Sequence, residues 1–276
     1  MAKFKPDEMD VTRPVDEMRN VEVQLDFTPN ALGSVLYRQG DTVVLACATV
    51  AARMPRWFPR DATKGWVHAE YSLLPGSTDS RFQRERRGAK GRTHEIQRLI
   101  ARALRGCIDL EQLGPHSVTV DCDVLNADGG TRCASITAAY IALRLAVRRL
   151  IANGACLPPN MRPTWEEKKS DDWVPPELSA AERAEHERAV LPQNMSAISV
   201  GMVDGKAYLD LDYVLDSAAD VDMNVIMTSD GRFAEVQSTG EEATFSQEEL
   251  IELLDLARKG AEELHTIQDQ TLKGIE

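Results

Sequence analysis

The chain has 276 residues and a formal net charge of −12 at pH 7. This charge argues against a generally basic coat for binding nucleic acid, although it leaves room for a local basic patch. Hydrophobic residues make up 43% of the chain, enough for a sizeable core in one large domain or in two halves of one. No stretch is long and apolar enough to span a membrane, so we expect a protein without a membrane partner.

The cysteine pattern and the start of the chain favour a cytoplasmic protein. The five cysteines contain no CxxC pair, and most of them lie in apolar runs. This pattern is typical of reduced thiols in the core of a cytosolic protein. The first residues carry no apolar signal core, and the polar residues 1–20 predict an arm.

Apolar alternation predicts the first strands. Residues 39–41 have the sequence Gln-Gly-Asp and predict a hairpin between two apolar runs. The run after this turn is apolar on both faces, which indicates a central strand. The predicted strands of this part are 21–27, 33–38, 42–50 and 66–72.

An arginine-rich loop, 75–91, leads into a predicted helix. The apolar residues of this helix follow i, i+3, i+4 spacing from Ile96 to Ile108. From residue 81 to 105, Glu85 and Glu95 are the only acidic residues among nine basic ones, so this segment has a positive net charge in an otherwise acidic chain. Such a segment suits an RNA phosphate backbone, and a solvated face or a subunit contact is the alternative for some arginines. The basic residues are Arg81, Arg84, Arg86, Arg87, Lys90, Arg92, Arg98, Arg102 and Arg105.

A second strand-to-helix junction predicts a phosphate site. A strand-like run, 116–125, is followed by Gly129-Gly130-Thr131-Arg132 and then by an apolar helix that ends near Ile151. A helix start carries N–H groups without partners, glycine lets an anion approach the backbone, and arginine suits phosphate. The alternative is that the glycines only form a turn and that Arg132 is a solvated helix residue.

The second half begins with a proline-rich and acidic segment, 156–194. It contains two tryptophans and a short helical pattern over 178–190. We expect it to be partly ordered, with at least one tryptophan docked, and to project from the sheet without replacing a core element. Asp-Gly turns then predict two hairpins, and Ser246 with Glu249 predicts a capped closing helix. The predicted hairpin strands are 197–203 with 207–214, and 225–228 with 233–236.

Aspartates are dense between the two hairpins. Carboxylates repel a nearby polyanion unless a cation such as Mg²⁺ bridges the two. Alternatively, a carboxyl group with a raised pKa stays protonated and can donate its proton to a leaving oxygen. We expect Asp220 to lie in a surface turn. Alternation with leucines places Asp210 and Asp212 on the solvated face of a strand. From these residues alone, the site binds phosphate groups, and the reaction stays open.

Several stretches together resemble ribonuclease PH, the bacterial family of phosphorolytic 3′→5′ exoribonucleases. The resemblance implies an α+β fold of βαβα units around mixed sheets, with residues 1–276 as a single domain and 156–194 as an insertion that is atypical of the family. It also implies a homohexameric ring built as a trimer of dimers. The principal stretches are Gly40-Asp-Thr-Val-Val-Leu45, Gly65-Trp-Val-His-Ala-Glu-Tyr71, Gly91-Arg-Thr-His-Glu-Ile-Gln-Arg-Leu-Ile100, Ala127-Asp-Gly-Gly-Thr-Arg-Cys-Ala-Ser-Ile-Thr137 and Asp216-Ser-Ala-Ala-Asp-Val-Asp-Met-Asn224.

The resemblance further implies an activity and site residues. Inorganic phosphate attacks the last phosphodiester of an RNA 3′ end, often that of a precursor tRNA, and a nucleoside 5′-diphosphate leaves. Asp216 and Asp222 match positions linked to a divalent metal, with Mg²⁺ expected, or to acid catalysis. The residues matching the phosphate site are Arg92, Gly130, Thr131 and Arg132, and those matching the RNA path are Arg81, Arg84 and Arg86.

Two alternatives differ in class. A non-catalytic RNA-binding subunit of an exosome-like ring would share the fold but lose site residues, whereas the matching residues are all present here. A nucleotide-binding phosphotransferase would need a glycine-rich ATP loop, and the chain has no G-x-x-x-x-G-K-[ST] sequence. The arginine-rich loop is shorter than is usual in the family, and Gly76 stands where an arginine is frequent.

Overall fold

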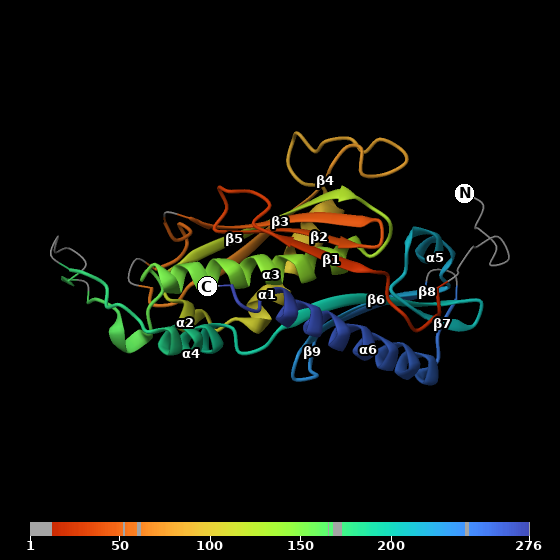
Figure 1. Cartoon of the computed structure of the whole chain (residues 1–276). Helices are drawn as coiled ribbons and strands as arrows, with labels where there is room; N and C mark the ends of the chain where they lie inside the picture. Colours follow the sequence, from red (N-terminus) through yellow and green to blue (C-terminus); the bar gives the residue numbers. More distant parts are fainter. Residues whose placement is uncertain are drawn as a thin grey trace.

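Two β-sheets lie on either side of one long apolar helix in the computed structural model of the chain (Figure 1). The structure describes residues 13–51, 53–59, 62–164, 166–167, 173–240 and 243–275. Within these ranges, none of the helices combines the length and apolar character needed to cross a membrane.

The first sheet is mixed, and its one parallel pair positions the site. Its strand order is β1-β2-β3-β5-β4, with all pairs antiparallel except β4 with β5. Each parallel strand is followed by a helix, so the helices α1 (Gly91–Cys107) and α3 (Thr131–Ala152) begin at the same edge of the sheet. The strands are β1 (Val21–Leu25), β2 (Gly33–Gln39), β3 (Thr42–Ala51), β4 (Trp66–Leu73) and β5 (Ser117–Asn126).

Helix α3 forms the centre of the core. Most of its residues are buried, because it packs on β2, β3 and β5 on one side and on β6 (Met195–Val203) of the second sheet on the other. The contact with β2 is so close that a Cβ atom on Gly33 would lie 2.2 Å from the carbonyl oxygen of Ala142. Glycine is therefore required there. A short helix, α2 (Leu110–Leu113), joins α1 to β5.

The second sheet is antiparallel throughout, so only the first of the two sheets is mixed. Its strand order is β7-β6-β8-β9, and both faces of the inner strand β6 are covered. Ala197 belongs to the core around α3, whereas Ile198 packs with residues of α6 (Gln247–Thr271). The capping box of Ser246 and Glu249 at the start of α6 is confirmed. The strands are β6 (Met195–Val203), β7 (Lys206–Leu209), β8 (Val221–Thr228) and β9 (Phe233–Gly240).

The predicted strand 207–214 is wrong in its second half. β7 ends at Leu209 because Asp210 has a φ of 57°, which a strand does not accommodate. A short helix, α5 (Tyr213–Ala218), follows, and the side chain of Asp212 accepts a hydrogen bond from the Leu215 N–H at its start. β8 begins earlier than predicted, so Asp222 lies within a strand.

The segment 156–194 packs on the core around α3, whereas we expected it to project from the sheet. It contains a short 3₁₀ helix, η2 (Pro159–Met161), and α4 (Ala180–Val190). Val190 is buried in the main core, and Glu187 forms ion pairs with Arg144 and Arg148 of α3. Trp173 packs half-buried against this core, which confirms that a tryptophan of the segment is docked. Trp165 lies outside the described residues.

Candidate active site

The candidate site lies where the starts of α1 and α3 meet. Arg92 is the second residue of α1, and Thr131 and Arg132 open α3. Neither helix has an acidic residue in its first turn or a side-chain hydrogen bond at its N-cap. By helix geometry, the first N–H groups of each helix have no acceptor inside it and carry partial positive charge. Two positive helix ends therefore begin at one edge of the first sheet, and each carries an arginine as its second residue.

Two side-chain contacts join the helix starts. Arg132 Nη2 donates to Glu95 Oε2 at 2.9 Å, and Glu95 lies one turn after Arg92 on α1. The hydroxyl of Tyr71, near the end of β4, donates to Thr131 Oγ1 at 3.1 Å. Burial raises the pKa of Tyr71, while the hydrogen bond to Thr131 and the charges of Arg92 and Arg132 act to lower it. Both arginines thus lie near the tyrosine hydroxyl.

The Nε–H group of Arg132 is a buried hydrogen-bond donor at the start of α3. Its side chain is 24% exposed, and its Nε is buried without a hydrogen-bond partner among the residues that the structure describes. Burial acts to lower the pKa of Arg132, but the hydrogen bond and charge of Glu95 outweigh it and raise the pKa. The group therefore stays charged. A buried donor without an acceptor is costly, which favours an acceptor such as an oxyanion at this point.

The two glycines before α3 have separate structural roles. A Cβ atom on Gly129 would lie 2.5 Å from the carbonyl oxygen of Leu211, so the close approach of two chain segments requires glycine. Gly130 is the N-cap and has the left-handed φ of 62°. Thr42 Oγ1 donates to the carbonyl oxygen of Gly129 at 2.7 Å. The glycines thus form the turn that sets where Thr131 and Arg132 lie.

A buried ion pair supports this turn from below. Asp210 is 1% exposed, and its carboxylate accepts hydrogen bonds from the backbone N–H, Nε and Nη2 of Arg19 at 2.8, 2.9 and 2.7 Å. Arg19 also donates to the carbonyl oxygens of Asp128 and Leu211. The prediction of a solvated Asp210 is therefore wrong. The predicted arm, in its described part, instead ties the second sheet to the turn before α3.

The two candidate acidic residues come from different elements of the second half. Asp216 lies on α5, and Asp222 lies on β8. Burial raises the pKa of the Cys133 thiol in the first turn of α3, and the charges of Asp222 and Asp216 add to this rise. The charge of Asp222 also acts on Arg132. Both carboxylates are therefore close enough to the start of α3 to affect its groups electrostatically.

A metal site built by protein side chains alone is not found within the described ranges. No group of three or more His, Cys, Asp or Glu side chains there is placed to hold a metal ion. Asp216 and Asp222 nevertheless supply hard oxygen donors. Such a pair fits Mg²⁺, which binds through one or two carboxylates and shares the phosphates of its substrate.

The arginine-rich loop lies beside the helix starts. Arg81, Arg84 and Arg86 are exposed on it. Glu85 anchors the loop, because its carboxylate accepts hydrogen bonds from the Lys90 N–H and the Thr93 hydroxyl, both at 3.1 Å. Burial raises the pKa of Asp123 on β5, and the charge of Arg84 opposes this rise. Arg84 is thus near the strand that precedes α3.

Sequence reasoning missed several residues that hold the site together. Tyr71 alternates in β4 like any half-buried aromatic residue, and Thr42 lies in an apolar run. Arg19 lies in a stretch that looks like a polar arm. Only Glu95 gave a signal, as one of two acidic residues in a basic stretch.

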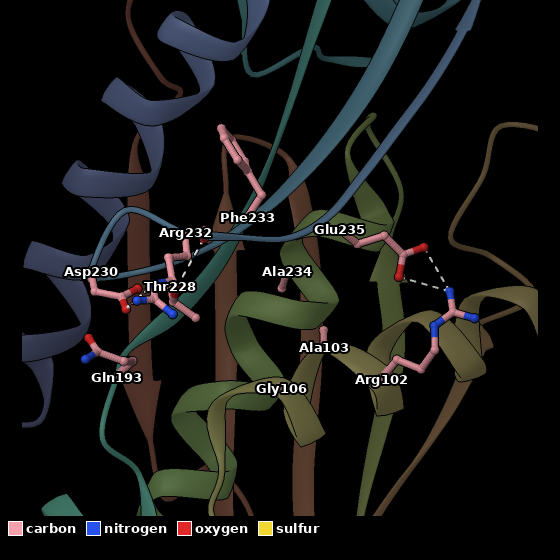
Figure 2. Close-up of a pocket in the computed structure, with 10 residues that line it drawn as sticks. All are labelled: Arg102, Ala103, Gly106, Gln193, Thr228, Asp230, Arg232, Phe233, Ala234 and Glu235. Carbon is pink, nitrogen blue, oxygen red and sulfur yellow. Dashed lines mark hydrogen bonds and ion pairs between the residues drawn. The ribbon is translucent and has the colours of Figure 1, made fainter.

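A separate pocket lies further along α1 (Figure 2). Arg102 Nη2 of α1 and Glu235 of β9 form an ion pair at 2.8 Å on its rim, and Gly106, Thr228 and Phe233 line it. None of the candidate phosphate or acidic residues lines this pocket.

Comparisons with known proteins agree with this arrangement. Domain 1 of the 3′ exoribonuclease family matches residues 17–148, and domain 2 of the same family matches residues 194–260. The segment between the two matches is largely the proline-rich and acidic one. Among solved structures, rice (Oryza sativa) Rrp46 has a TM-score of 0.69 at 16% identity over 95% of this chain and 99% of that chain. The Archaeoglobus fulgidus exosome with RNA bound to the active site has a TM-score of 0.66 at 21% identity, covering 92% and 90%.

Curated relatives match at much higher identity. The ribonuclease PH of Rhodopirellula baltica is 50% identical over 264 residues, which cover 95% of this chain and 97% of that protein. The ribonuclease PH of Corynebacterium kroppenstedtii is 45% identical over 262 residues, covering 94% of this chain and 91% of that protein. The chain therefore belongs to the ribonuclease PH family of 3′ exoribonucleases.

Proposed function

We propose that the chain is a phosphorolytic 3′→5′ exoribonuclease, which trims RNA 3′ ends and uses inorganic phosphate to release nucleoside 5′-diphosphates. One observation carries the proposal beyond family membership. Two positive helix starts, with Arg92 on one and Thr131 and Arg132 on the other, are joined around a buried donor that has no partner among the described residues. A site that holds one phosphate beside another needs this concentration of donors.

The reaction balances without an external oxidant or reductant. An oxygen of inorganic phosphate forms a bond to the phosphorus of the last phosphodiester. The bond from that phosphorus to the 3′-oxygen of the preceding nucleotide breaks, and the 3′-oxygen takes up a proton. The last nucleotide leaves as a nucleoside 5′-diphosphate, and the reverse reaction adds a nucleotide to the RNA.

The main barrier is that both the nucleophile and its target are anions. Arg92, Arg132 and the N–H groups at the start of α3 hold inorganic phosphate, and Gly130 and Thr131 place that helix start. Tyr71 fixes the hydroxyl of Thr131 through their hydrogen bond. Donors that are already in position stabilise the extra charge of the transition state without having to reorganise.

Asp216 and Asp222 act on the leaving oxygen. They are the residues that would hold Mg²⁺, which when bound reduces the repulsion between the phosphates and stabilises the leaving 3′-oxygen. In the alternative, one of the two carboxyl groups donates the proton that the 3′-oxygen needs. The charge of Asp222 acts on Arg132, which supports placing these carboxylates beside the phosphate site.

The remaining assignments concern the RNA and the assembly. Arg81, Arg84 and Arg86 guide the RNA backbone, with the 3′ end of a precursor tRNA as the preferred substrate, since exposed arginines attract phosphates. The active form is a homohexameric ring, a trimer of dimers, in the cytoplasm. Residues 1–276 act as one domain, with 156–194 as an insertion whose α4 is anchored on α3.

A product analysis tests the proposed function. A tRNA with a 3′ extension is incubated with the protein, with and without phosphate, and the released nucleotides are separated. Nucleoside diphosphates that appear only with phosphate are expected. Nucleoside monophosphates formed equally well without phosphate would identify a hydrolase. RNA binding without any product would identify a non-catalytic ring subunit.

A further inference from the structure

Glu95 places a carboxylate inside a site that otherwise attracts anions. Its Oε2 atom accepts a hydrogen bond from Arg132 at 2.9 Å, and its side chain is 41% exposed. A fully deprotonated oxyanion bound between Arg92 and Arg132 would meet this negative charge. A site meant only to maximise affinity for anions would not contain it.

The position of Glu95 keeps it beside the ligand. It follows Arg92 by one helical turn, so both side chains project from the same face of α1. Its partner Arg132 also carries the Nε donor that is buried without a partner in the described part of the chain. A carboxylate offers about four lone-pair positions, and the contact with Arg132 uses one of them. Glu95 therefore keeps capacity to accept a further hydrogen bond.

We propose that Glu95 is a specificity-determining residue that selects protonated oxyanions, phosphate and arsenate, over sulfate. The proposal rests on the assignment of Arg92 and Arg132 as the phosphate site. At neutral pH inorganic phosphate carries at least one P–OH group, whereas sulfate carries no proton. The P–OH group donates a charge-assisted hydrogen bond to Glu95. A sulfate oxygen at the same place leaves two negative groups in contact, and this repulsion discriminates against sulfate.

The competing role for Glu95 is only to orient Arg132. In that case, removing the carboxylate loosens a guanidinium that both anions use, so phosphate and sulfate lose affinity by the same factor. The ratio of phosphate affinity to sulfate affinity therefore distinguishes the two roles. Removing the carboxylate leaves this ratio unchanged if Glu95 only orients Arg132, and lowers it if Glu95 recognises the proton of phosphate.

The experiment compares the protein with its Glu95→Gln and Glu85→Gln variants. Glu85 is the matched control, since it is the other carboxylate near the start of α1 and contacts Lys90 and Thr93. For each protein, the KM for phosphate and the inhibition constant for sulfate are measured during RNA trimming. Calorimetric titration with each anion gives the same ratio without turnover, and thermal unfolding checks the fold.

The expected result is that Glu95→Gln reduces the preference for phosphate over sulfate by on the order of tenfold or more, the size of one charged hydrogen bond. Sulfate inhibits this variant more strongly than it inhibits the wild-type protein, and the affinity for arsenate changes as that for phosphate does. Glu85→Gln keeps the wild-type ratio of phosphate affinity to sulfate affinity. An unchanged ratio in Glu95→Gln, by kinetics or by calorimetry, would overturn the proposal. A ratio that shifts in calorimetry while no protein phosphorolyses RNA would refute the proposed function and leave the role of Glu95 intact.

Discussion

Replacing Asp210 by asparagine removes the charge that pairs with Arg19 beneath the turn before α3. The wild-type carboxylate receives hydrogen bonds from Arg19 at 2.8, 2.9 and 2.7 Å and is 1% exposed. Breaking a buried ion pair costs about 3–5 kcal/mol. Arg19 keeps a longer contact with Asp128, at 3.5 Å, which places the expected cost at the lower end of this range. Asparagine keeps one acceptor oxygen, so we expect a loss of about 3 kcal/mol in the free energy of unfolding.

Urea unfolding at a fixed protomer concentration measures this loss, since oligomer stability depends on concentration. Asp204→Asn is the control, because Asp204 lies exposed in the β6–β7 turn. A double-mutant cycle with Arg19→Met isolates the pair from other effects of each substitution. A loss below about 1 kcal/mol for Asp210→Asn, the size of a surface pair, would refute the reasoning.

The contribution of Asp210 to the free energy of unfolding should decrease as the pH falls. Burial acts to raise the pKa of Asp210, but the hydrogen bonds and charge of Arg19 outweigh it and hold the pKa below its ordinary value. A depressed carboxyl pKa stabilises the fold above the unfolded-state pKa, which is about 3.9 for Asp. This stability is lost as the pH falls through the folded-state pKa. The difference between wild type and Asp210→Asn should therefore shrink as the pH falls below that range.

Three further predictions concern the site itself. Arg92→Ala and Arg132→Ala should each lower the rate by on the order of 10²-fold with a large rise in the KM for phosphate, because each loses a preorganised donor; wild-type phosphate saturation in a folded variant would contradict this. Asp222→Asn should abolish turnover with RNA binding nearly intact, and Asp220→Asn should be almost silent in the same filter-binding and trimming assays. An inactive Asp220→Asn beside an active Asp222→Asn would show that Asp222 is the wrong carboxylate. Arg84→Ala should flatten the log–log salt dependence of single-strand RNA binding by about 0.7, whereas an unchanged slope would place Arg84 away from the RNA.

Local patterns predicted most elements of the fold. Alternation and turn sequences found the strands of both sheets, and Ser246 with Glu249 marked the start of α6. The break after β7 was not predictable, because nothing in a Leu-Asp-Leu-Asp pattern indicates the left-handed φ of Asp210. Its partner Arg19 is 191 residues away in sequence, and one chain gives no signal for such a pairing.

Composition was a poor guide to the segment 156–194. Its acidic and proline-rich sequence suggested a projection from the sheet, yet Val190 of α4 is buried in the core around α3, and Glu187 pairs with arginines of α3. Residues of the candidate site were easier to identify where a helix start itself is the functional feature. Arg92, Thr131 and Arg132 are marked by their place at the start of a predicted helix, whereas Tyr71 depends on a tertiary contact.

The most direct test of phosphorolysis follows the phosphorus atom of the attacking phosphate. RNA with an unlabelled 3′ extension is incubated with the protein and radiolabelled inorganic phosphate, and the released nucleotides are separated. Phosphorolysis predicts that the label appears in the β-phosphoryl group of the nucleoside diphosphates, one labelled group for each nucleotide removed. Nucleotides released without label would show that water is the nucleophile and would contradict the account.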